Sequence, residues 1–98
     1  MKIIIVDDDK LVSLSIKTIL MSHQIETLSI GSNAEEAILL YKQNTPDIIL
    51  MDIRMGEKDG LYAAEEIIKY DKKTNMLIDC KAAKIISFRF NFLRSEIL

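Results

Sequence analysis

Short, continuous runs of apolar residues alternate along the chain with longer stretches in which apolar residues recur every three or four positions. Residues 3–6 and 47–51 contain the clearest runs, and their length and continuity indicate strands buried on both faces. Residues 25–30 and 76–80 are weaker strand candidates. Since strands that alternate with helical stretches are joined by right-handed crossovers, the pattern predicts a doubly wound α/β fold, a parallel sheet with helices on both faces.

The stretches between these strands have helical periodicity. The first helix is expected to be amphipathic and to end near Ser22. Its apolar positions are Leu11, Val12, Ile16, Ile19 and Leu20. A second helix is expected to start at Ser32, because Ser32 and Glu35 have the spacing of a capping box, and to end before Pro46. A third helix is predicted from Leu61 to about Tyr70.

The last part of the chain has a different pattern. Ile86, Phe88, Phe90 and Phe92 alternate with polar residues, which is the period of a strand with one apolar face. Too few residues separate this segment from a strand at 76–80 for a parallel crossover, which needs about 10 to 12. The alternatives are an antiparallel hairpin, a helix in place of one strand, or exchange with a second chain.

Size and composition limit the kind of protein. A chain of 98 residues with 49% hydrophobic and 29% charged residues is expected to form one globular domain over residues 1–98. A formal net charge of -2 argues against direct nucleic-acid binding. No stretch approaches the about 18 apolar residues of a membrane span, and the acidic residues 7–9 follow the first apolar run too closely for a signal peptide. We therefore expect a cytoplasmic protein without membrane contact.

Acidic residues stand at the ends of two predicted central strands. Asp7 and Asp8 follow the first strand, and Asp52 follows the third. Because parallel strands end at the same edge of a sheet, these three carboxylates are expected to lie together. They would repel one another unless a cation neutralises them, and Mg²⁺ suits such oxygen ligands. One carboxylate could then accept a phosphoryl group as an acyl phosphate. Asp9 alone is better interpreted as a helix N-cap.

The segments Val6-Asp7-Asp8-Asp9, Asp52-Ile53-Arg54-Met55 and Asp59-Gly60-Leu61 resemble those of the receiver domains of two-component response regulators, and the resemblance covers about residues 1–78. It implies a flavodoxin-like receiver fold in which Asp52 is the phosphoacceptor. It also implies Mg²⁺ bound by Asp52, by Asp8, by Asp7 directly or through water, and by the backbone carbonyl of Arg54.

The resemblance implies a function as well. A histidine kinase or phosphotransfer protein would donate the phosphoryl group, and the domain would be a self-phosphorylating signalling module rather than a turnover enzyme. The alternative is a degenerate receiver that acts as a binding or dimerisation module independent of phosphorylation. A magnesium-dependent phosphatase is disfavoured, because such enzymes need a second aspartate two residues after the nucleophile, where this chain has Arg54.

Residues 79–98 depart from the family. Receiver domains continue with a fourth strand ending in Thr or Ser and a fifth ending in Lys, each followed by a helix. In this chain Cys80 falls near the position of the family's Thr or Ser, and Ser87 would take that position only if the alignment shifted by several residues. Lys81 and Lys84 come too early in the sequence to match the family's lysine. We expect a sheet shortened or rearranged after the fourth strand, through divergence, truncation or a disrupted reading frame. A sheet edge and apolar face left uncovered would favour a homodimer through this segment.

Overall fold

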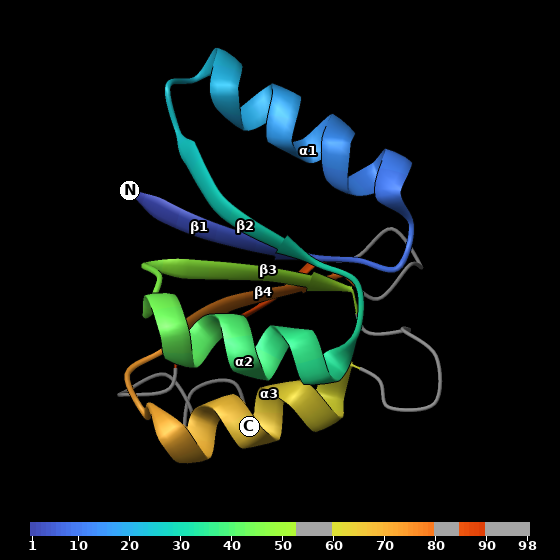
Figure 1. Cartoon of the computed structure of the whole chain (residues 1–98). Coiled ribbons are helices and arrows are strands. Elements are labelled where there is room, and N and C mark those ends of the chain that lie inside the picture. The colour runs from blue at the N-terminus through green and yellow to red at the C-terminus, as the bar shows by residue number, and fades with distance from the viewer. Residues whose placement is uncertain (53–59, 80–84, 90–98) are drawn as a thin grey trace.

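A five-stranded sheet forms the centre of the computed structural model, which describes residues 1–52, 60–79 and 85–89 (Figure 1). The strands are β1 (Lys2–Val6), β2 (Glu26–Gly31), β3 (Ile48–Asp52), β4 (Asn75–Asp79) and β5 (Ile85–Arg89). Their order is β2-β1-β3-β4-β5; the first four are parallel, and β5 is antiparallel to β4. This is the flavodoxin-like strand order, so the predicted doubly wound α/β fold is confirmed.

Helices cover both faces of the sheet. They are α1 (Lys10–Ser22), α2 (Ala34–Asn44) and α3 (Gly60–Tyr70). Figure 1 shows α1 on one face, with α2 and α3 side by side on the other. The crossover from β1 to β2 runs one way along the sheet, and those from β2 to β3 and from β3 to β4 run the other way. Right-handed crossovers therefore put α1 on one face and α2 and α3 on the other. Within the described part of the chain, no helix is long and apolar enough to cross a membrane.

The main core lies between the sheet and the pair α2 and α3. Alternate strand residues point to this side, among them Ile4, Val6, Ile49, Met51 and Met76, all at most 2% exposed. The helices meet them largely with alanine, since Ala34, Ala37, Ala63 and Ala64 are buried in the same cluster. Small side chains let the helices approach the strands closely, and Tyr41 and Ile67 fill the remaining space.

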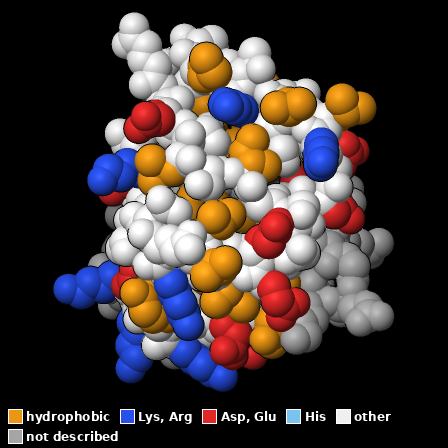
Figure 2. Space-filling view, in the orientation of Figure 1, with side chains coloured by type: hydrophobic (Ala, Val, Ile, Leu, Met, Phe, Trp, Pro, Cys, Tyr) orange, Lys and Arg blue, Asp and Glu red, His pale blue; other side chains and the backbone are white. Residues whose placement is uncertain are grey.

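The face of the sheet under α1 is packed less closely. The prediction of the apolar face of α1 is wrong in part, because Leu11 and Ile19 are 76% and 59% exposed. Ser13 is the one buried residue of this helix. Apolar side chains therefore lie at the surface over α1, between charged ones (Figure 2). A cavity of about 270 Å³ separates Ile16 of α1 from Ile5, Leu50 and Leu77 of the sheet.

The start of α2 differs from the prediction by one residue. Asn33, not Ser32, is the N-cap, and its Oδ1 accepts the backbone N–H of Glu36 at 2.8 Å. Glu36 in turn accepts the backbone N–H and the hydroxyl of Ser32, both at 2.7 Å. Buried Gly31 precedes this turn, and a Cβ there would lie only 3.2 Å from Leu40 Cδ1. The glycine thus allows α2 to approach the end of β2.

After β4 the chain returns as an antiparallel hairpin, one of the three alternatives that the sequence left open. Five residue pairs join β4 to β5, from Asn75 opposite Arg89 to Asp79 opposite Ile85. Ser87 stands opposite Leu77 in the middle of the strand, so its backbone is not at the edge where β4 ends. The residues outside the described part of the chain include Cys80, Lys81, Lys84, Phe90, Phe92 and residues 53–59.

Candidate functional site

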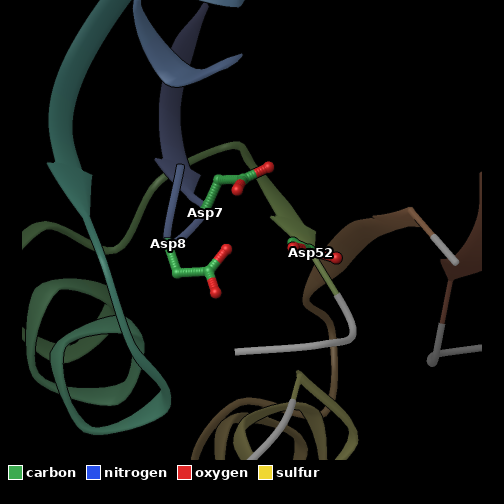
Figure 3. Close-up of side chains that lie close together, drawn as sticks. All are labelled: Asp7, Asp8 and Asp52. Carbon is green, nitrogen blue, oxygen red and sulfur yellow. The ribbon is translucent and has the colours of Figure 1, made fainter. Parts of the chain in front are cut away.

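Three aspartates meet where β1 and β3 end. Val6 of β1 is paired with Met51 of β3, so Asp7 and Asp52 come next to each other at the edge of the sheet. Figure 3 shows the carboxylates of Asp7 and Asp8 extending toward the side on which Asp52 lies. One carboxylate oxygen from each residue lies within 4.8 Å of the other two. The expected proximity of these three side chains is therefore present in the structure.

The local backbone fixes the position of Asp7. Its N–H donates to the carbonyl of Gly31 at 3.1 Å, which extends the pairing of β1 with β2 by one residue. Its Oδ1 accepts the N–H of Asp9 at 2.9 Å, which holds the side chain in a tight turn. Asp7 is 6% exposed as a result.

Asp9, the third residue of the acidic run 7–9, is not one of the three aspartates whose carboxylates meet. Its Oδ1 accepts the backbone N–H of Leu11 at 2.9 Å, and its own backbone is extended, as an N-cap requires. The predicted cap is confirmed. The backbone turn between Asp7 and Leu11 thus directs one acid toward Asp52 and another toward the helix.

The environment of the group favours a bound cation. Asp7 and Asp52 are buried, at 6% and 2% exposure, and Asp8 is exposed. Burial of several carboxylates within a few ångströms is costly unless positive charge compensates. Hard oxygen donors around a position open to solvent on one side suit Mg²⁺, which retains water ligands and binds one or two carboxylates. The donor set therefore fits this ion, while the predicted carbonyl ligand of Arg54 lies outside the described residues.

Comparison with known proteins identifies the family. The model of the response regulator receiver domain matches residues 3–89. The chain belongs to this family. The receiver domain is 36% identical over 81 residues to the chemotaxis protein CheY of Bacillus subtilis, covering 83% of this chain and 67% of that protein. It is 35% identical to CheY of Thermotoga maritima, with the same coverage. The resemblance noted from the sequence is confirmed, and the protein is the receiver domain of a CheY-like response regulator.

Solved structures agree with this assignment. The receiver domain superposes with a TM-score of 0.77 and 26% identity on a chain of the CheX-CheY-BeF₃-Mg²⁺ complex from Borrelia burgdorferi, covering 80% of this chain and 60% of that one. A LuxR-family response regulator from Aurantimonas gives a TM-score of 0.76 at 28% identity, covering 79% and 56%. The chain thus spans about two thirds or less of the length of these relatives.

One acidic residue at this edge was missed by the sequence analysis. Asp79 ends β4, and its Cα is the register partner of Asp52 in the adjacent parallel strand. The sequence signal that could have identified Asp79 is that a third central strand, like the other two, ends in an acidic residue. Four acidic residues from three neighbouring strand ends therefore belong to one edge of the receiver domain.

Proposed function

We propose that this receiver domain accepts a phosphoryl group on Asp52 in a Mg²⁺-dependent reaction, as a step of two-component signal transduction. The observation that supports the proposal is the meeting of the Asp7, Asp8 and Asp52 carboxylates within 4.8 Å of one another. The ion would be held by these three residues and by the carbonyl of Arg54, and it would neutralise charge on the transferred group.

The remaining chemistry belongs to Asp52. One carboxylate oxygen attacks the phosphorus in line, the new O–P bond forms, and the bond from phosphorus to the donor breaks with its electron pair leaving on the donor. With a histidine kinase or phosphotransfer protein as donor, the leaving group is an imidazole. The burial of Asp52 at 2% exposure limits rotation of the side chain, so its oxygen is oriented before the donor arrives. The domain is modified once and does not turn over substrate as an enzyme would.

Exposed apolar side chains beside the acidic group support a protein as donor. Helix α1 begins at Lys10, immediately after the aspartates, and Leu11 and Leu14 of its first turns are 76% and 53% exposed. Apolar side chains grouped at a charged site are typical of a protein contact surface. The Borrelia relative, whose structure contains CheX, BeF₃ and Mg²⁺, is consistent with such a partner. We place this exchange in the cytoplasm, where kinases of this kind act.

A second candidate is a degenerate receiver that binds a partner or dimerises without phosphorylation. The antiparallel β5 favours it, because a family-like fifth strand would be parallel and would bring a lysine toward the site. Among the described residues β5 is the last strand of the sheet, and its outer edge is one to which another copy of the divergent segment 79–98 could add. A homodimer formed in this way would not need Asp52.

Intact-mass measurement after treatment with acetyl phosphate distinguishes the two candidates. We expect one phosphoryl adduct in Mg²⁺, none in the presence of a chelator, and none in Asp52→Asn. Asp47→Asn is the matched control, since Asp47 lies at the other end of β3 and is exposed. No adduct on the unmodified sequence at millimolar Mg²⁺, together with a dimer in sedimentation, would establish the second candidate instead.

A further inference from the structure

The strand pairing brings a fourth acidic residue next to the proposed phosphoacceptor. Asp52 and Asp79 are register partners in the parallel pair β3 and β4. Neighbouring strands are about 4.8 Å apart, so the backbone of Asp79 is in the row of positions next to that of Asp52. Because both residues end their strands, both belong to the edge at which Asp7 and Asp8 also lie.

A charge so placed affects two reactions in opposite directions. Over less than about 10 Å, an added carboxylate attracts a divalent cation and repels an added anion. Phosphorylation replaces the single negative charge of Asp52 by a group of about two negative charges. A negative charge carried at this register position would therefore stabilise the site with Mg²⁺ alone and destabilise the site that bears a phosphoryl group.

We propose that Asp79 is a specificity-determining residue of the candidate site, and that its negative charge favours the metal-bound, unphosphorylated form of the site. This inference rests on the proposed function, since it concerns the same reaction of Asp52. It predicts a receiver domain that binds Mg²⁺ readily and holds a phosphoryl group poorly. The signal would then decay quickly once the donor is removed.

The test measures the two reactions separately in the whole chain. Asp79→Asn removes the charge with little change in size. Calorimetric titration with Mg²⁺ alone should give a dissociation constant about fivefold higher than in the parent protein. Titration with beryllofluoride at saturating Mg²⁺, followed by fluorine NMR, should give a dissociation constant about fivefold lower. Asp47→Asn, the same change at the far end of β3, should alter neither.

Opposite shifts are decisive because damage to the fold would weaken both bindings. Both shifts should also shrink at about 1 M salt, where screening acts over about 3 Å. Equal binding by parent and variant, or shifts in the same direction, would overturn the role of Asp79 while leaving phosphoryl acceptance intact. If neither protein binds beryllofluoride in a manner that Asp52→Asn abolishes, the proposed function fails and this inference fails with it.

Discussion

The hydroxyl of Tyr41 donates a hydrogen bond of 2.7 Å to Oδ2 of Asp71, thirty residues further along the chain. Tyr41 belongs to α2 and is 1% exposed, whereas Asp71 follows the end of α3. The second oxygen of Asp71 accepts the N–H of Lys73 at 3.0 Å. One carboxylate thus connects α2 to the turn that leads into β4, at the opposite end of the sheet from the acidic group.

Tyr41→Phe should lower the free energy of unfolding by about 1 to 2 kcal/mol, because a hydrogen bond to a charged acceptor is lost while the ring remains packed. Denaturant titration measures the change. Tyr70→Phe is the control, since Tyr70 packs edge-on against Tyr41 at 6.5 Å but is 52% exposed. Equal losses in the two variants would mean that the contact with Asp71 contributes nothing.

The same tyrosine should make stability depend on alkaline pH. Burial, and next the neighbouring Asp71, raise the pKa of Tyr41 well above its ordinary value of 10.0. The unfolded chain therefore releases this proton near pH 10 while the folded chain keeps it, so stability is complete below that pH and falls above it. Denaturant midpoints measured between pH 8 and about pH 11 should decline less in Tyr41→Phe. Parallel declines would contradict the assignment.

The strands and their acidic ends were predictable because each depends on a short local signal. A short, β-branched apolar run such as residues 3–6 is typical of a strand covered on both faces, and parallel pairing then brings the strand ends to one edge. The proximity of Asp52 to Asp7 follows from that topology without knowledge of side-chain packing. Asp9 was equally predictable, since an N-cap is determined by the residues that follow it.

Features that depend on tertiary context were not predictable. Helix α1 has apolar residues on several sides, so periodicity alone could not show that Leu11 and Ile19 face outward and Ser13 inward. The N-cap of α2 was displaced by one residue because Ser32, Asn33 and two successive glutamates permit two capping registers. The sequence limited the possible arrangements of β5 but did not determine one. A short connection excludes a strand parallel to β4 but does not require an antiparallel hairpin.

Asp8→Asn should weaken Mg²⁺ binding by at least about tenfold and stabilise the metal-free protein, because three carboxylates within 4.8 Å repel when no cation is bound. Thermal unfolding with and without Mg²⁺ measures both effects, since an ion that binds only the folded chain raises its stability. Asp9→Asn is the matched control: it removes the same charge one residue away, and asparagine caps a helix as well as aspartate does. Similar Mg²⁺ responses in the two variants would argue against Asp8 as a ligand.

The capping contact at the start of α2 should be visible in acid. The hydroxyl and then the backbone N–H of Ser32 donate to Glu36 and lower the pKa of its carboxyl below the ordinary 4.5. The stability that this contact adds is therefore complete above about pH 4.5 and is lost as the pH falls through the lowered value.

Glu36→Gln tests that dependence directly. At pH 7 it should cost about 0.5 to 1 kcal/mol, as for other helix caps, because a neutral amide accepts the two Ser32 donors less strongly. Below pH 4 the difference from the parent should shrink, since protonation removes the same charge there. Glu35→Gln, a change of the same kind in the same helical turn, separates the contact with Ser32 from the general preference of a helix N-terminus for negative charge. A loss that is equal for both variants, and constant with pH, would assign the effect to the helix dipole alone.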